Sequence, residues 1–243
     1  IGSVCETEVS LENVYYLNSS CDKAVGMFDD GGNDTPGTVT GEAAAKTETE
    51  MKEASFAELL GDAFAADTQT AGGYPVLIMQ KPMGEEAPVR AGLEIGTAEE
   101  LIAFAERVNK GERFTGKTVA LTAHIDLSEV YNWIPIGRSG DYSFDGIFDG
   151  CGYVIDNLYS VSGGLFGYVG ANAVIKNVGV ASGEIGKAEN YTQFLGGIAN
   201  WSNGADFIGC WNGADIYCAG YSGGIVGTVR DGGESLIREC YNA

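Results

Sequence analysis

The stretch Ile155-Asp156-Asn157-Leu158-Tyr159 contains the pattern that predicts the fold. It has an apolar residue first, then Asn, Gly or Glu third, and an aliphatic residue or Cys fourth. The same phrase occurs at 11–15 (LENVY), 175–179 (IKNVG), 207–211 (FIGCW) and 237–241 (IRECY). Its fourth positions are Val14, Leu158, Val178, Cys210 and Cys240, and the last four are 20, 32 and 30 residues apart. We expect these five side chains to be buried and stacked, because each fills the same place in its repeat.

A second phrase, Gly-Gly-apolar-apolar, alternates with the first at 163–166, 196–199 and 223–226. Glycine suits tight corners because it adopts positive φ without steric cost. Short strands separated by glycine corners stack about 4.8 Å apart when each repeat forms one turn of a solenoid. We therefore predict a mostly β chain that forms a right-handed parallel β-helix-like solenoid with short capping helices. The alternative is a sandwich of hairpins, which would favour two-residue Asn-Gly turns between alternating strands.

Composition supports a β-rich fold and excludes some partners. Glycine accounts for 37 of the 243 residues, and 44% of the residues are apolar. The formal net charge of −20 repels phosphate backbones and anionic membrane surfaces, so we expect neither nucleic-acid binding nor membrane insertion.

Two capping boxes predict helices. Thr47-Glu48-Thr49-Glu50 opens a helix that should run to about Leu60 and end at Gly61. Thr97-Ala98-Glu99-Glu100 opens a second helix over 98–109. The second helix carries one apolar face, made of Leu101, Phe104, Ala105 and Val108. We expect both helices to cover apolar ends of the solenoid.

The chain divides into three predicted segments. Residues 1–80 would be a closing rung plus a helical cap segment, with a long polar loop over 18–45 and a short strand over 74–80. Residues 81–92, which include Pro82 and Pro88, have the composition of a linker. Residues 93–243 would form the β-helix module, with the helix at 98–109 as its N-terminal cap.

Two of the glycine phrases resemble the GLUG motif of bacterial cell-surface and adhesin-like proteins. They are Gly164-Leu165-Phe166-Gly167 and Gly224-Ile225-Val226-Gly227, whereas Gly197-Ile198-Ala199-Asn200 departs at its last position. The stretches 133–137 (WIPIG) and 144–155 resemble the entry turn of the same β-helical proteins. The resemblance implies an extracellular structural or adhesive module at a bacterial cell surface. It names no ligand, because such repeats serve as scaffolds in proteins of varied roles.

Polysaccharide lyases and glycoside hydrolases also occur on parallel β-helices, so the carboxylates must be considered as possible catalytic residues. Asp145, Asp149 and Asp156 fall near one turn, with Arg138 close in sequence. Asp145 and Asp149 each precede glycine, which is the ordinary arrangement of an Asx turn. His124 has no nucleophile phrase near it. We therefore expect no enzyme, with a carbohydrate-active enzyme as the alternative.

Peptidases that carry this repeat lend the chain no catalytic residues, because it has no His-Glu-x-x-His. Trp133, Trp201 and Trp211 could stack on sugars in a glycan-binding module, but packing inside the fold is the favoured interpretation. No cofactor is expected. The weak Ca²⁺ candidate is the loop that contains Asp29, Asp30, Asn33 and Asp34, and a solvated loop is favoured there.

The two ends of the chain match an internal segment. Reading from Cys240 through Ala243 into Ile1 and Cys5 gives two cysteines 8 residues apart, as in Cys210–Cys218. Residues 1–17 could complete the last rung of their own chain or that of a neighbouring unit, or the chain could be one unit of a longer tandem protein. The start at Ile1 suits a processed subunit, and we expect completion between units, giving a head-to-tail fibre or tandem stalk.

The predicted assembly contacts place Cys5 one rung from Cys218. The predicted assembly residues are Ile1, Val4, Cys5, Leu11, Val14, Cys218, Ile237, Cys240 and Tyr241. Copies of the chain or neighbouring repeat units are the expected partners, and a host or matrix glycan or protein is a further one.

Overall fold

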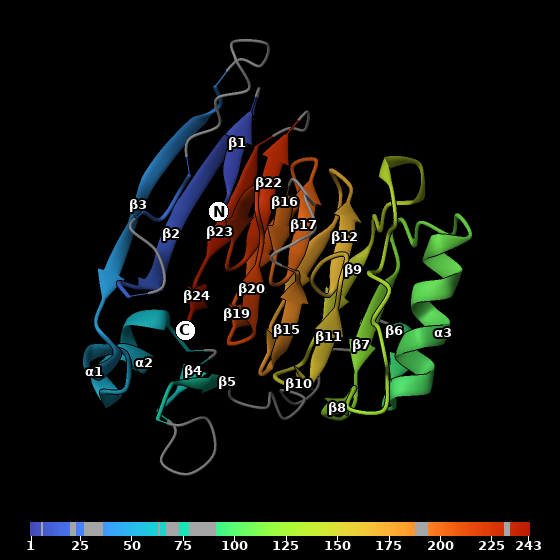
Figure 1. The fold of residues 1–243 in the computed structure, drawn as a ribbon, viewed down its shortest axis with the longest axis horizontal. Coiled ribbons are helices and arrows are strands. Elements are labelled where there is room, and N and C mark those ends of the chain that lie inside the picture. The colour runs from blue at the N-terminus through green and yellow to red at the C-terminus, as the bar shows by residue number, and fades with distance from the viewer. Residues whose placement is uncertain are drawn as a thin grey trace.

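The computed structural model describes residues 1–5, 7–19, 23–26, 36–62, 64–66, 73–77, 91–187, 194–230 and 234–243. The chain is mostly β, with parallel sheets and few helices, which confirms this part of the expectation. Consecutive strands form a rung, and each rung lies beside the next in parallel register (Figure 1). Both termini lie at one end of the molecule, next to β23 and β24, while α3 lies at the other.

The largest sheet runs the length of the molecule. Its strands, in spatial order, are β6 (Ala91–Ile95), β7 (Thr118–Leu121), β9 (Ile147–Asp149), β13 (Val174–Lys176), β18 (Asp206–Ile208), β23 (Ser235–Arg238), β2 (Glu8–Leu17), β24 (Tyr241–Asn242), β19 (Trp211–Asn212), β14 (Gly179–Val180), β10 (Val154–Asp156) and β8 (Ile125–Asp126). The long strand β2 pairs with both β23 and β24, and β3 (Thr38–Lys46) pairs with β2.

Smaller sheets complete each rung. One contains β1 (Ser3–Cys5), β22 (Val226–Arg230), β17 (Ala199–Ser202) and β12 (Phe166–Val169). A second contains β11 (Leu158–Ser160), β15 (Gly183–Gly186) and β20 (Asp215–Tyr217). The remaining pairs are β16 (Phe194–Gly196) with β21 (Tyr221–Gly223), and the antiparallel β4 (Phe64–Ala65) with β5 (Val76–Leu77).

A column of apolar side chains follows the register of the main sheet. Phe148 aligns with Ile175, Ile175 with Phe207, Phe207 with Ile237, and Ile237 with Leu11. All five are buried in one hydrophobic core. Burying a side chain of this size contributes about 1.5–3 kcal/mol, so each rung stabilises its neighbours along the column.

The third position of the repeated phrase is a corner of the backbone. Its residues all have positive φ, namely Asn13 (51°), Asn157 (55°), Asn177 (52°), Gly209 (61°) and Glu239 (54°). Asparagine tolerates this left-handed region better than other residues with a Cβ, whereas glutamate enters it at a cost. The repeat therefore encodes corners by Asn as well as by Gly.

The expected ladder of fourth positions is correct for four residues and wrong for Leu158. Trp211, Tyr241 and Tyr15 donate backbone N–H bonds to the carbonyls of Val178, Cys210 and Cys240, which stacks those rungs in order. Val178, Cys210 and Cys240 are fully buried, and Val14 is half-buried. Leu158 is also buried, but it lies in β11 and pairs with Gly183 of β15, in a different sheet from the other four residues.

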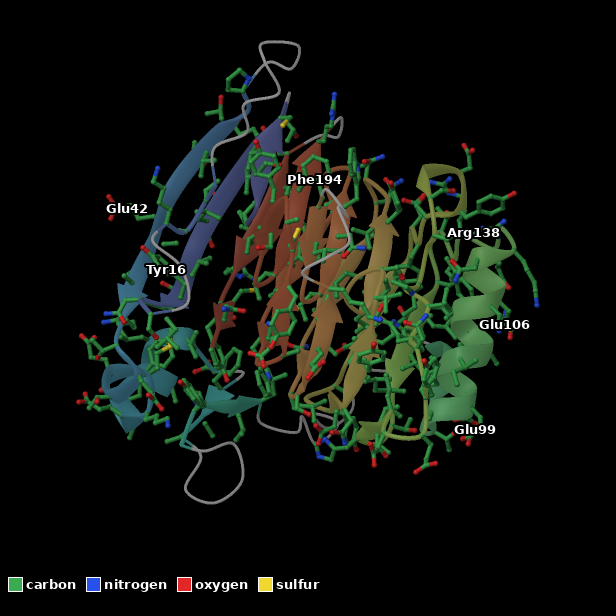
Figure 2. The ribbon with its side chains drawn as sticks, in the orientation of Figure 1. Tyr16, Glu42, Glu99, Glu106, Arg138 and Phe194 are labelled. Atoms are coloured by element: carbon green, nitrogen blue, oxygen red, sulfur yellow. The ribbon has the colours of Figure 1, made fainter. Side chains whose placement is uncertain are left out.

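Helix α3 (Ala98–Asn109) forms as predicted. The Thr97 hydroxyl caps it by accepting the backbone N–H of Glu100 at 3.2 Å. Leu101, Phe104 and Val108 point into the core, while Figure 2 shows Glu99 and Glu106 on the outer side of the helix. The helix thus covers the first rungs, as expected.

The other predicted helix is split in two. Thr47 and Glu50 form the expected capping box at α1 (Glu48–Met51). The helix is interrupted after Met51, and α2 (Ala54–Leu60) ends at Gly61, which has a φ of 99°. Phe56 and Leu60 pack with Tyr241 beside the last rungs. One short 3₁₀ turn, η1 (Gly140–Tyr142), completes the helical elements of the described residues.

Two sequence boundaries need correction. The segment 18–45 was expected to be a loop, but 38–46 form β3, because they pair with the free edge of β2 along its length. The predicted linker 81–92 overlaps β6 at Ala91 and Gly92, and 81–90 lie outside the described residues. The predicted strand 74–80 is the short β5, and 78–80 also lie outside them. No described helix has the length and apolar character needed to cross a bilayer.

Candidate functional site

Residues 1–17 pair with the last strands of their own chain. Ser3 aligns with Thr228, Leu11 with Ile237 and Tyr15 with Tyr241. The Ser3 and Thr228 hydroxyls are buried and lie 2.8 Å apart across this junction. The expectation that these strands complete a neighbouring unit is therefore wrong for this structure. Closure within the chain prevails because a tethered strand meets its partner at a high effective concentration.

The predicted assembly residues other than Cys5 and Cys218 contact other parts of their own chain at this junction. Leu11, Val14, Ile237, Cys240 and Tyr241 come together in adjacent strands, with Val4 aligned on Val229. Ile1 donates its N–H to the carbonyl oxygen of Ala24 at 3.0 Å. These residues hold the chain together instead of joining two units.

Cys5 and Cys218 do not lie on adjacent rungs as predicted. Cys5 aligns with Arg230 in β22, whereas Cys218 follows β20 in a different sheet. The spacing of 8 residues suggested that β1 follows β24 in the way that β20 follows β19. In the structure β1 instead pairs with β22, in a different sheet. The stacked pair is instead Cys210 and Cys240, where the Cys210 N–H lies 3.4 Å from the Cys240 Sγ.

Tyr241 anchors the last rung to the helical segment. Its ring stacks on Trp211 at a centroid distance of 5.6 Å and meets Phe56 and Phe64 edge-on at 6.0 and 5.7 Å. Its hydroxyl donates to the carbonyl oxygen of Pro75. Tyr241 is thus a packing residue between the sheets and α2.

The tryptophans follow the packing interpretation at two of three positions. Trp211 and Trp133 are buried, and the Trp133 Nε1 donates to the Leu165 carbonyl oxygen at 3.1 Å. Trp201 is half-buried and stacks on Tyr168 at 5.6 Å, with Phe194 edge-on at 5.3 Å. Trp201 is the tryptophan that keeps part of its ring at the surface.

A cleft of about 280 Å³ opens beside the C-terminal strand. Its walls combine six separate stretches of chain. The lining residues are Ile1, Val14, Tyr15, Tyr16, Lys23, Ala24, Ala214, Asp215, Ile216, Ser222, Gly223, Gly224, Ile225, Asn242 and Ala243. Figure 2 labels Tyr16, which borders the cleft from β2. Sequence reasoning missed this cleft, although the match of Asn212 with Asn242 was the available signal.

The candidate carboxylates have separate partners. Asp149 accepts the Cys151 N–H at 2.9 Å, which confirms the Asx turn there, and it pairs with Lys176 at 2.9 Å. Asp145 is buried and makes no such turn, since it faces Arg113 at 3.6 Å and accepts the Asn172 N–H at 3.3 Å. These contacts hold loops between neighbouring rungs.

The remaining candidates for chemistry are also structural. Asp156 accepts the Asn157 N–H at 3.0 Å, and Arg138 lies over the Tyr142 ring at 4.3 Å. The His124 Nδ1 accepts the Val154 N–H at 3.2 Å. Among the described residues no group of three His, Cys, Asp or Glu side chains could hold a metal. The Ca²⁺ candidates Asp29, Asp30, Asn33 and Asp34 lie outside the described residues.

Two of the described thiols, those of Cys151 and Cys210, have a raised pKa. Burial, followed by the neighbouring Asp149 carboxylate, raises the pKa of Cys151 to about 11. Burial also raises the pKa of Cys210 well above its usual value, and the adjacent Cys240 adds to the rise. Thiols with a raised pKa are poor nucleophiles at neutral pH.

Comparison with known proteins identifies no family for this chain. No family model matches the chain, and no curated protein matches it. One solved structure, from Bacteroides ovatus and titled "putative immunoglobulin A1 protease", is similar at 21% sequence identity with a TM-score of 0.41. The match covers 61% of this chain and 56% of that one, so the chain spans about half of that protein. A likeness this distant carries no functional argument.

Proposed function

We propose that this chain is an extracellular, non-catalytic structural module of a bacterial surface protein, built as a right-handed parallel β-helix. The observation that carries the proposal is the unbroken parallel pairing from β6 through β23 to β2 and β3. Stacked rungs of this kind make a stiff body whose length grows with the number of repeats. The GLUG-like phrases and the resemblance to adhesin-like proteins support a location at the cell surface.

The two ends of the module suit a place in a tandem stalk. Helix α3 covers the first rungs. At the opposite end, β3 is paired along one edge only, with β2, among the described residues. Along β3, seven of nine residues are exposed, and Figure 2 shows Glu42 pointing away from the sheet. Charged side chains on an edge strand disfavour edge-to-edge association with other chains. Residues 1–17 pair within the chain, so a tandem stalk does not require their exchange between units.

Two measurements test the proposal. Antibodies against the purified chain should label intact cells of the source bacterium without permeabilisation. A screen for polysaccharide cleavage, run with and without Ca²⁺, should find no turnover above that of heat-denatured protein. Labelling that requires permeabilisation would refute the surface location. Turnover that fails after Asp145→Asn and Asp149→Asn substitution would establish the alternative, a carbohydrate-active enzyme.

A further inference from the structure

We infer that Cys210 and Cys240 form a disulfide between two neighbouring rungs when the chain folds in an oxidising environment. Both thiols are free in this structure. Disulfides form and persist outside the reducing cytosol, so the inference rests on the proposed extracellular location. The other described cysteines lie elsewhere, with Cys5 in β1, Cys151 at the corner after β9 and Cys218 after β20.

The two cysteines lie directly opposite each other. β18 and β23 pair in parallel register before the corner, and β19 and β24 do so after it, with the same offset of 30 residues on both sides (Figure 1). Neighbouring strands lie about 4.8 Å apart, which falls within the roughly 4.4–6.8 Å between Cα atoms that a disulfide needs. The Cys240 Sγ already reaches across this spacing, because the Cys210 N–H lies 3.4 Å from it.

The Cys210 side chain must turn to close the bond. Its Sγ donates to the carbonyl oxygen of Ile175 at 3.4 Å, and β13, which contains Ile175, lies on the opposite side of β18 from β23. A thiol is a weak donor, so this hydrogen bond gives way at little cost. Rotation about χ1 moves the sulfur between staggered positions and leaves the backbone in place. The flanking ladder residues, Val178 and Val14, offer no competing sulfur.

The chemistry requires an oxidant, which a small-molecule disulfide such as oxidised glutathione supplies. One cysteine thiolate attacks a sulfur of that disulfide, which forms a mixed disulfide and releases the first small thiol. The second cysteine thiolate then attacks the protein sulfur of the mixed disulfide, so the Cys210–Cys240 bond forms and the second small thiol leaves. The two protein thiols lose their hydrogens, and the two released thiols take them up.

Burial decides when this reaction can occur. Both residues are fully buried in the core, and burial holds the pKa of Cys210 well above its usual value. The folded chain therefore reacts slowly, and the bond forms while the core around β18 and β23 is still open. Once the bond has formed, the same burial keeps reductants away from it. The bond then fixes the rung of β23 and β24 to the rung before it and opposes their separation.

Refolding of the whole chain tests the inference. Denatured, reduced chain is diluted into mildly alkaline buffer that contains oxidised and reduced glutathione, and a parallel sample is refolded with a reductant. After free thiols are blocked with N-ethylmaleimide, non-reducing peptide mapping by mass spectrometry should find the peptide of Cys210 joined to that of Cys240. The cross-link restricts the unfolded chain, so the oxidised sample should melt roughly 5–10 °C above the reduced one.

Alanine variants, each compared in both refolding buffers, are the controls. Cys210→Ala and Cys240→Ala should each lose the cross-link and the melting difference between the two samples. Because each variant is compared with itself, the cavity that alanine leaves affects both samples equally. Cys151→Ala, at a corner outside the ladder, should keep the cross-link and the melting difference.

Three results would overturn the inference. They are alkylation of both Cys210 and Cys240 after oxidative refolding, linkage of either residue to a different cysteine, and equal melting of the cross-linked and reduced chains. The mapping uses the unaltered chain, so it decides the question even where an alanine variant fails to fold. Antibody labelling that requires permeabilised cells would refute the proposed surface location and leave the refolding result unchanged, so the two failures are distinguishable.

Discussion

Replacing Phe104 by alanine should detach helix α3 from the first rungs. Phe104 is fully buried, and its ring contacts three other aromatic rings. It meets Phe114 and Phe144 edge-on at centroid distances of 5.0 and 5.7 Å, and it stacks on Phe148 at 6.1 Å. Truncation of a buried Phe to Ala costs about 3–5 kcal/mol of unfolding free energy. Three lost aromatic pairs place the expected loss in the upper half of that range.

The matched control is Ile102→Ala on the same helix. Ile102 is half-buried at the border of the core, so its truncation should cost about 1–2 kcal/mol. Urea unfolding measures both losses, and hydrogen exchange shows where they act. In Phe104→Ala, the amides of α3, β6 and β7 should exchange faster, whereas those of β18 and β23 should change little because rungs contact only their neighbours. Equal destabilisation by the two substitutions would refute the role of α3 as a cover held by Phe104.

Three further predictions concern other parts of the molecule. Val178→Asp buries an unpaired charge in the ladder and should cost several kcal/mol, whereas Tyr217→Asp, at a 43% exposed residue, should melt like the parent. Deleting residues 1–10 removes β1 and part of β2, so thermal denaturation should occur at a lower temperature and exchange should quicken in β22 and β23; an unchanged melt would contradict closure within the chain. Cys151, with a pKa of about 11, should react slowly with iodoacetamide at pH 8 and about tenfold faster for each pH unit up to 10. Asp149→Asn should speed that reaction, because it removes the second cause of the raised pKa, and mass spectrometry of the alkylated peptide measures the rate.

Local signals in the sequence predicted the elements that depend on nearby residues. The helix at 98–109 follows from Thr97 and from the spacing of its apolar face, both of which act within a few turns. The corners at Asn177 and Glu239 were not predicted, because corners were expected at the glycine phrases, although both residues hold the same place in the repeated phrase. By contrast, the burial of Val178 and Cys240 could be predicted from their shared fourth position in the repeated phrase.

Features that depend on distant pairing were not predictable in this way. Periodicity alone gives the same rung whether residues 1–17 join their own chain or another. The strand at 38–46 contains Gly41, Glu42 and a run of alanines, so its composition resembles a loop, and only the edge of β2 makes it a strand. Leu158 was assigned to the wrong ladder, although its spacing of 20 residues to Val178 differed from the later spacings of 32 and 30.

The pairing of the first strand with one of the last sets the order in which a nascent chain can fold. Ser3 and Thr228 are partners 225 residues apart, so β1 emerges from the ribosome long before β22 exists. At a synthesis rate of about 5–20 residues per second, β1 waits roughly 10–50 seconds for its partner. The middle rungs, whose partners lie much closer along the chain, can form during that interval. Strand β1 must therefore wait until β22 has been synthesised, even though β2 can pair earlier with the nearby β3.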